Sequence, residues 1–367
     1  ALFQALRDPG FAGGGVVGLM SYDAGARSAT GERSGAWPDL MLARYPAVLA
    51  FDHQKKVVHA VGRGRTAAEA REQIRRAAGW LTLTEAPDAP SAPASAFDGE
   101  APPEVYEAAV ADVVARIAAG ELFQANIARA WSGRLEAGRD PFDVFLRLSA
   151  ARGAAYGAFW RLGGRAIVSN SPELFLTFDG VDGRMETRPI KGTRPRDPDP
   201  AIDAVLAAEL AASAKDRAEN LMIVDLMRND LARAARPGSV RVERLFEVER
   251  HPTVHHLVST VSAQAADGFG PADVLEAAFP PGSITGAPKH QAMKVIAGHE
   301  PPRGPWWNAP DMLAGASSGC AGPPAASTAN GASSFRAQKG RSIQWLPRSD
   351  MVPPPKSHQR YHFGPGT

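Results

Sequence analysis

Apolar and polar residues alternate in several short stretches of the chain, which is typical of β-strands with one buried face. Residues 47–51 and 57–61 flank a polar turn at 52–55 and predict a hairpin. Residues 11–22 are apolar and dense in glycine, with no helical pattern after them, and predict a strand with close backbone contacts. The remaining predicted strands lie at 121–129, 156–162, 166–169, 174–178, 240–248 and 254–263.

Apolar residues recur at helical spacing in other stretches and predict helices. At 200–235 the pattern fits two helices that meet near Ser213, or one bent helix. Residues 280–288 lead into a helix that runs to about residue 297, with Pro288 suited to its first turn. The other predicted helices lie at 67–81, 104–119, 140–148 and 273–278.

Composition divides the chain into four parts. Residues 1–84 are expected to be an N-terminal part of the fold that begins inside a domain, and the Pro-, Ala- and Ser-rich stretch 85–103 is expected to be a linker. A patterned region follows at 104–303. The last part, 304–367, is rich in Pro, Ser, Gly, Ala and Arg and lacks a sustained period, so it is expected to be disordered.

Length and composition are those of a globular protein: 367 residues, 44% hydrophobic and 22% charged. The chain has no apolar run of the ~20 residues that a membrane helix needs. A single cysteine, Cys320, excludes an internal disulfide framework, so a cytoplasmic protein without membrane association is expected. Residues 301–367 hold seven basic and two acidic residues; such a tail can attract nucleic acid or anionic lipid, but we expect neither.

The stretch 187–196, Thr-Arg-Pro-Ile-Lys-Gly-Thr-Arg-Pro-Arg, contains the candidate for chemistry. Its prolines restrict the backbone, Gly192 allows a ligand to approach closely, and Thr193 adds a hydroxyl, so we expect a rigid loop around Lys191. The alternative for Lys191 is a solvated surface charge.

Candidate ligand-binding groups lie in three further segments. Glu173 follows Ser171-Pro172, although a strand-end carboxylate in solvent is an alternative. Glu219 stands four residues after Lys215, which also fits an exposed ion pair. His256 follows His255 in a predicted strand, where a structural histidine is the alternative, and the pair is not a zinc pattern. The stretch 282–289, Gly-Ser-Ile-Thr-Gly-Ala-Pro-Lys, predicts an anion site at a helix N-terminus.

Four segments stand out in chain order: Ser-Pro-Glu-Leu-Phe at 171–175, Pro-Ile-Lys-Gly-Thr at 189–193, the run 215–230 that ends Arg-Asn-Asp, and the stretch 282–289. In this order and spacing they resemble the chorismate-utilising enzymes, the family of anthranilate synthase, isochorismate synthase and aminodeoxychorismate synthase. The resemblance covers about residues 14–303. It implies an α+β fold in which two large, mostly antiparallel sheets form an anthranilate-synthase-like sandwich with helices outside.

The resemblance also implies residue roles. Anthranilate synthases have alanine at position 191, whereas aminodeoxychorismate synthases have lysine, which would attack C2 of chorismate while the C4 hydroxyl leaves. Ammonia from a glutamine amidotransferase subunit would then add at C4, for 4-aminobenzoate and folate synthesis. Glu173 would act as general acid and Glu219 would hold Mg²⁺. The residues expected to bind substrate are Gly192, Thr193, His256, Thr285, Gly286 and Ala287.

The pattern of the family ends after Pro305. Its Tyr-x-Gly-Ala segment, its Ile-Arg-Thr segment and its last glutamate-bearing helix have no counterpart, so the C-terminal strands and helix are expected to be lost. We attribute the tail to a shifted reading frame; a natural disordered tail is the alternative. We therefore expect weak activity. The alternatives left open are an anthranilate or isochorismate synthase and an impaired remnant that only binds partner or substrate.

Overall fold

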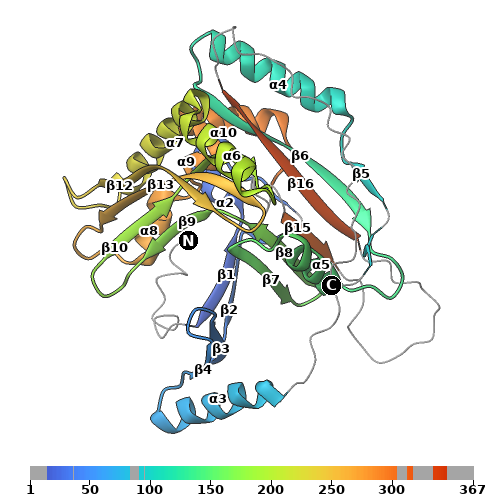
Figure 1. Ribbon diagram of the computed structural model, residues 1–367, viewed down its shortest axis with the longest axis vertical. Coiled ribbons are helices and arrows are strands. Elements are labelled where there is room, and N and C mark those ends of the chain that lie inside the picture. Colours follow the sequence, from blue (N-terminus) through green and yellow to red (C-terminus); the bar gives the residue numbers. More distant parts are fainter. Residues whose placement is uncertain are drawn as a thin grey trace.

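The computed structural model describes residues 15–35, 37–82, 91–94, 96–303, 312–316 and 334–344, and within these residues it contains two large antiparallel sheets (Figure 1). The larger sheet has seven strands in the order β14-β6-β16-β15-β8-β7, with β5 beside β6. Its strands are β5 (Phe97–Gly99), β6 (Gln124–Arg134), β7 (Tyr156–Leu162), β8 (Arg165–Ser171), β14 (Gly286–Ala287), β15 (Met312–Ala316) and β16 (Ser334–Gln344).

The second sheet has five strands and carries most of the predicted chemistry. Their order is β11-β13-β10-β9, with β12 on the other side of β13. These strands are β9 (Leu174–Phe178), β10 (Arg184–Arg188), β11 (Ile190–Pro195), β12 (Arg241–Arg250) and β13 (Val254–Gln264). Together the sheets confirm the predicted α+β architecture with two large sheets.

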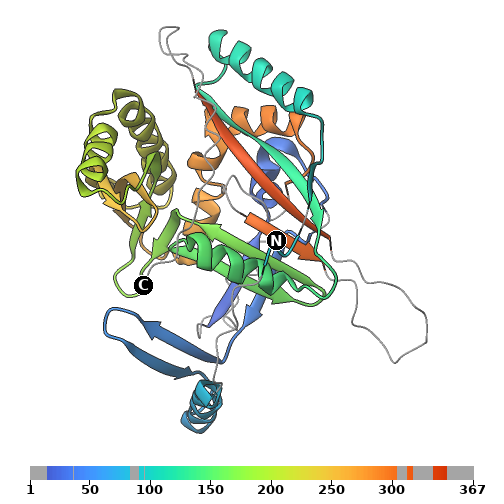
Figure 2. The ribbon, with the colours of Figure 1, turned by 45° about the vertical axis from the view of Figure 1, so that its right-hand side comes forward.

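Two small ribbons complete the strands. β1 (Val16–Met20) pairs with β2 (Leu40–Arg44), and β3 (Ala47–Asp52) pairs with β4 (Val57–Gly62), which confirms the predicted hairpin. Helix α3 (Ala67–Gly79) follows β4, and a short 3₁₀ turn follows α3 at Trp80–Thr82. Figures 1 and 2 show β3, β4 and α3 projecting away from the two large sheets.

The predicted helices are present, with ends that differ by a few residues. The region 200–235 forms two helices that meet at Ser213, whose side chain caps the second one by accepting from the Asp216 amide at 3.2 Å. The helices are α4 (Pro103–Ala118), α5 (Pro141–Arg152), α6 (Pro200–Ala212), α7 (Ala214–Ala232), α8 (Pro271–Ala278), α9 (Gly282–Thr285) and α10 (Lys289–His299).

Helix α2 (Tyr22–Thr30) was not predicted, because it is only nine residues long and Tyr22 is its one large apolar residue. Its start is nevertheless marked in the sequence, since Ser21 accepts a hydrogen bond from the amide of Ala24 at 3.0 Å. The first helical turn is buried at Tyr22, Asp23 and Ala24, so contacts with the rest of the fold stabilise this helix.

The expected loss of the C-terminal strands was wrong for two segments of the tail. β16 pairs with β6 over eleven positions, and β15 pairs with both β8 and β16. Strand pairing uses main-chain amides and carbonyls, so it needs no regular side-chain pattern once a partner strand offers an edge. The expected linker likewise contains β5, which pairs with β6. The rest of 304–367 lies outside the described residues.

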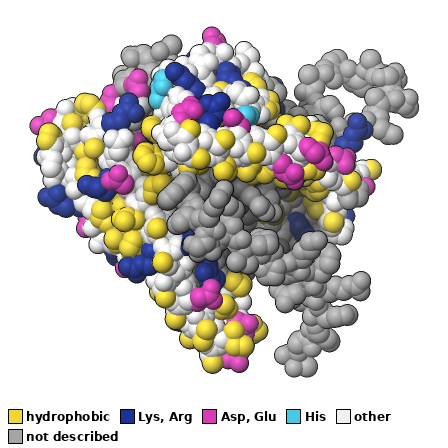
Figure 3. All heavy atoms as spheres, turned by 90° about the horizontal axis from the view of Figure 1, so that it is seen from above, with side chains coloured by type: hydrophobic (Ala, Val, Ile, Leu, Met, Phe, Trp, Pro, Cys, Tyr) yellow, Lys and Arg dark blue, Asp and Glu magenta, His cyan; other side chains and the backbone are white. Residues whose placement is uncertain are grey.

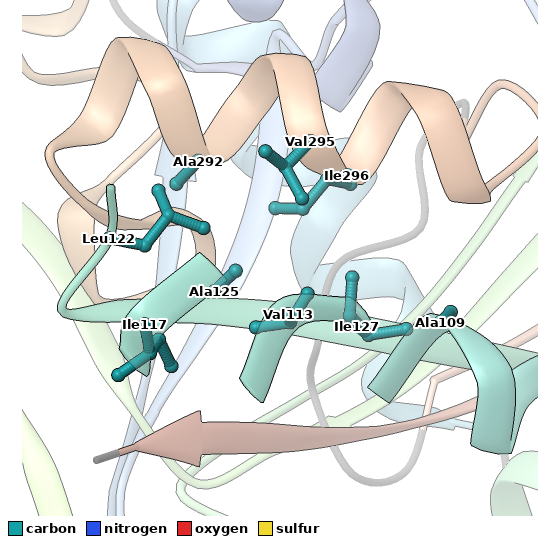
Figure 4. Packing of buried hydrophobic residues seen from close by; sticks show 9 residues of the cluster. All are labelled: Ala109, Val113, Ile117, Leu122, Ala125, Ile127, Ala292, Val295 and Ile296. Carbon is teal, nitrogen blue, oxygen red and sulfur yellow. The ribbon is translucent and has the colours of Figure 1, made fainter. Parts of the chain in front are cut away.

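One hydrophobic cluster joins the larger sheet to α4 and α10 (Figure 4). Strand β6 contributes Ala125 and Ile127, which lie two residues apart and therefore face the same side. Full burial of a side chain as large as isoleucine contributes about 1.5–3 kcal/mol. The members from the helices and the turn before β6 are Ala109, Val113, Ile117, Leu122, Ala292, Val295 and Ile296.

A second cluster places α7 over the five-stranded sheet. Val224 and Leu231 of α7 pack with Met185 of β10 and Val261 of β13, and Val274 of α8 joins them. Helix α7 also contacts β11, the strand that contains Lys191, so α7 brings its carboxylates close to that strand.

The surface of the described residues carries charges of both signs. Figure 3 shows basic and acidic side chains interspersed on the face seen from above. No helix in the described part of the chain is long and apolar enough to cross a bilayer.

Candidate active site

Lys191 lies in strand β11, not in the loop that we expected, and the strand is irregular at this point. Ile190 is opposite Val258 and Thr193 is opposite His256, so Lys191 and Gly192 together face one residue of β13. Such a bulge bends the strand and redirects a side chain. The Lys191 side chain is 15% exposed, which excludes a freely solvated surface charge.

Gly192 lets the bulge approach α7. Its φ is +94°, a value that residues with a side chain rarely adopt. A Cβ at this position would lie 2.9 Å from Cβ of Asp216 and 3.0 Å from Cδ1 of Leu210. The glycine is therefore required both for conformation and for space.

Two carboxylates share the surroundings of Lys191. Its Nζ lies 3.9 Å from Oε1 of Glu219, whose side chain is 17% exposed. Burial raises the pKa of Glu219, and the charges of Lys191 and Lys215 oppose that rise. Burial also raises the pKa of Glu173, opposed by Lys191 and by the amide of Ile190, which donates to Oε1 at 3.4 Å.

The helix that carries Glu219 is fixed to β13 by the residue that follows Glu219. Asn220 is fully buried, donates to the carbonyl of Leu257 at 3.1 Å and accepts from the hydroxyl of Ser259 at 2.5 Å. These bonds fix α7 against β13. The exposed Lys215–Glu219 pair considered from the sequence is not what the structure shows, because the Glu219 side chain is 17% exposed and lies 3.9 Å from Lys191, while the charge of Lys215 also acts on it.

Asp216 and Arg194 form an ion pair at the same place. The Nη2 atom of Arg194 lies 3.2 Å from Oδ2 of Asp216, and its Nε donates to Glu209 at 2.9 Å. This pair fixes β11 to α6 and α7 one turn from Glu219. The sequence indicated that Asp216 could face the site, because it precedes Glu219 by one helical turn, but we assigned no role to Asp216.

Thr193 and His256 are directly opposite each other on β11 and β13, and Oγ1 of Thr193 lies 2.9 Å from Nδ1 of His256. Burial lowers the pKa of His256 to about 4, with a further contribution from His251, and Glu249 opposes both. His256 is therefore neutral at pH 7. The structure therefore brings these two expected substrate-binding residues together, and Thr193 lies two positions after Lys191 on β11.

The predicted anion site at 282–287 is more enclosed than expected. Thr285 is fully buried, and its hydroxyl donates to the carbonyl of Pro281 at 3.0 Å, so this hydroxyl proton is used inside the turn. Gly286 and Ala287 are buried and form β14, which pairs with β6. Their role as backbone donors to a substrate stays a prediction.

The turn is anchored to α7 by a buried ion pair that sequence reasoning missed. Asp230 pairs with Lys289 and accepts from the amide of Gly282 at 2.8 Å, and Lys289 donates to the carbonyl of Ala278 at 3.3 Å. Burial raises the pKa of Asp230 and lowers that of Lys289. Both residues lie in the segments quoted from the sequence, but the contact joins residues 59 positions apart and no local pattern indicates it.

A largely buried lysine near two carboxylates, on a strand that pairs with the strand of a neutral histidine, defines a site for nucleophilic and acid–base chemistry. The two-sheet fold around it is that of a larger group of enzymes. Residues 2–312 match the family of chorismate binding enzymes, and this chain belongs to that family.

Known members of the family are similar over most of this chain. Aminodeoxychorismate synthase component 1 of Salmonella typhimurium is 44% identical over 299 residues, which are 80% of this chain and 63% of that protein. Anthranilate synthase component 1 of Streptomyces coelicolor is 40% identical over 309 residues, 78% of this chain and 60% of that protein. The chain thus spans less than two thirds of the length of these relatives.

The fold agrees with a solved structure of the family. Anthranilate synthase component I from Streptococcus pneumoniae superimposes with a TM-score of 0.72 at 26% identity, covering 90% of this chain and 76% of that one. The expected anthranilate-synthase-like fold is confirmed.

Proposed function

We propose that this chain aminates chorismate at C4 to give 4-amino-4-deoxychorismate. The observation that carries the proposal is the position of Lys191, which is largely shielded from water in a bulge and has Glu219 as its neighbour at 3.9 Å. In the proposed reaction, the side-chain nitrogen of Lys191, in its unprotonated form, forms a bond to C2; both ring double bonds shift by one position, and the C4 hydroxyl takes up a proton and leaves as water. Ammonia then adds at C4, both double bonds shift back, and the bond between C2 and the lysine nitrogen breaks.

Glu173 has the property that the departing hydroxyl requires. Burial raises its pKa, so a larger fraction of this carboxyl is protonated near neutral pH than in water. A protonated Glu173 donates its proton to the C4 oxygen, and the resulting carboxylate remains near the charge of Lys191.

Glu219 would hold Mg²⁺. A carboxylate with restricted exposure is a suitable oxygen ligand, and among the described residues it has no cluster of three or more metal-ligating side chains around it. Mg²⁺ commonly binds through one or two carboxylates and completes its shell with water and substrate oxygens, so this donor set fits. The ion would neutralise a substrate carboxylate. Isothermal titration of Mg²⁺ into wild type and Glu219→Gln tests this assignment.

The partner in this proposal is a glutamine amidotransferase subunit that supplies ammonia. The support is the description of the similar Salmonella protein as component 1, which implies a second component there. Free ammonia can replace the partner in an assay.

The test is an ammonia-dependent assay with chorismate and Mg²⁺, with products separated by chromatography. Wild type should form 4-amino-4-deoxychorismate, and Lys191→Ala should lose more than about a hundred-fold in rate, since the covalent step is removed. Lys55→Ala, in the exposed turn between β3 and β4, is the control and should match wild type.

Three results would contradict the proposal. Undiminished turnover by Lys191→Ala would exclude the covalent role. Anthranilate or isochorismate as the product would assign the sister reaction. Chorismate binding without turnover by wild type, at any enzyme concentration, would identify a non-catalytic remnant.

A further inference from the structure

His256 is held on both sides by neighbouring strands. In the sheet, Thr193 of β11 and Glu249 of β12 are its direct cross-strand neighbours. Direct neighbours project from the same face of a sheet, so their side chains lie close together. Thr193 makes the 2.9 Å hydrogen bond to Nδ1, but a threonine hydroxyl on an exposed residue rotates easily and does not by itself fix the plane of the imidazole.

A second histidine lies against the ring of His256. The ring centroids of His251 and His256 are 5.2 Å apart, and the ring planes make an angle of 58°. This is the separation and tilt of a favourable aromatic contact. His251 lies in the connection between β12 and β13, and nothing in the proposed reaction uses it.

His251 is itself fixed in place. Its amide donates to the carbonyl of Val254 at 2.8 Å, and its carbonyl accepts from Nη1 of Arg196 at 2.8 Å. Its ring atom Nε2 is buried without a hydrogen bond and lies 3.6 Å from Oε2 of Glu249. The other oxygen of Glu249 accepts from Arg188 of β10. A rigid series of contacts therefore runs from β10 to the ring of His256.

We propose that His251, anchored by Glu249, is a positioning residue that holds the ring of His256 against Thr193, so that His256 can bind an anionic group of the substrate. This role rests on the proposed function. When Thr193 donates to Nδ1, the single N–H of a neutral imidazole lies on Nε2 and can donate to a carboxylate. The charge of His251 adds to burial in lowering the pKa of His256, and Glu249 acts in the opposite direction.

The test separates the ring of His251 from its charge. His251→Phe keeps the ring contact without the charge, His251→Ala removes both, and His53→Ala in an exposed turn is the control. Nitrogen NMR of the full chain without substrate reports the tautomer and titration of His256, assigned from His256→Gln. Both His251 variants should move the midpoint of His256 upward from about 4. Only His251→Ala should yield a mixture of tautomers.

Binding of chorismate provides the second measurement. His251→Ala should raise the Kd on the order of ten-fold, because the donor is no longer oriented, while His251→Phe should stay within about two-fold of wild type. Glu249→Gln, which removes the anchor but not the ring, should fall between them. Circular dichroism confirms folding of each variant.

The outcomes are distinct. An unchanged His256 spectrum in His251→Ala, or equal losses of affinity in the Phe and Ala variants, would overturn the proposal. If wild type does not bind chorismate, the proposed function fails, and the NMR spectrum of the free protein still decides whether His251 orients His256.

Discussion

Gly192 determines how closely strand β11, which carries Lys191, approaches α7. Its left-handed backbone and the 2.9 Å separation between an ideal Cβ and Asp216 leave no room for a side chain. Lys191 and Thr193 flank this glycine, so a shift of the backbone moves the candidate nucleophile and the partner of His256 together. A small displacement of reacting groups can cost on the order of a hundred-fold in rate.

Gly192→Ala should therefore reduce ammonia-dependent turnover on the order of a hundred-fold and lower the free energy of unfolding by roughly 1–3 kcal/mol. Denaturant unfolding and the chorismate assay measure the two effects. The control is Gly180→Ala, since a Cβ at this exposed glycine meets nothing within 4 Å. A wild-type rate in Gly192→Ala would show that the close approach is not required.

His256 makes stability depend on pH. Its pKa is about 4 in the folded protein and ordinarily 6.5, so the unfolded chain binds a proton that the folded chain excludes between these values. The contribution of neutral His256 is complete above pH 6.5 and is lost as the pH falls towards 4. His256→Gln should therefore flatten the decline of the urea midpoint between pH 6.5 and 4, whereas His53→Gln should not. An unchanged pH profile would indicate that His256 is not shielded in the folded state.

At the scale of elements, α7 connects the separate parts of the site. It carries Glu219 next to Lys191, Asn220 against β13, and Asp230 against the turn before α10. The buried Asn220 has its hydrogen bonds to Leu257 and Ser259 satisfied, and removing its amide leaves polar groups buried without partners.

Asn220→Ala should lower the free energy of unfolding by roughly 2–4 kcal/mol, because each buried group left without a partner costs about 1–3 kcal/mol. Asp225→Ala is the control on the same helix; its side chain is 76% exposed, and the change should stay within about 0.5 kcal/mol. Equal unfolding midpoints for the two variants would show that Asn220 does not fix α7 to the sheet.

At the level of the whole molecule, activity depends on whether the residues after Pro305 can replace the C-terminal segments of the family. The larger sheet contains β15 and β16, so its middle strands are paired. Backbone pairing does not replace a guanidinium aimed at a carboxylate, and the tail lacks the Ile-Arg-Thr segment that the family resemblance led us to expect. We therefore still expect slow turnover from this chain.

The coding DNA provides the test of the tail. If its reading frame is shifted, one alternative frame after Pro305 should encode the Tyr-x-Gly-Ala and Ile-Arg-Thr segments, and a protein translated in that frame should turn over chorismate faster. The absence of both segments from either alternative frame would refute the shift. A normal rate from the present chain would refute the expected loss of activity.

The strands and helices with a strong local period, such as the β3–β4 hairpin and the break at Ser213, could be predicted from the residues alone. It also indicated Lys191, Glu173, Glu219 and His256, because their segments resemble those of one family. Side-chain periodicity, turns and caps act over a few residues, so these features can be predicted from neighbouring positions.

How these residues act together depends on contacts that form only in the folded chain. The bulge at Lys191, the burial of the Thr285 hydroxyl, the Asp230–Lys289 pair and the His251–His256 contact all depend on strand register or helix packing. These contacts join residues that are far apart in the sequence, and the shielding of a group from water depends on every element packed around it. Neither the contacts nor the shielding is encoded in a pattern of neighbouring residues.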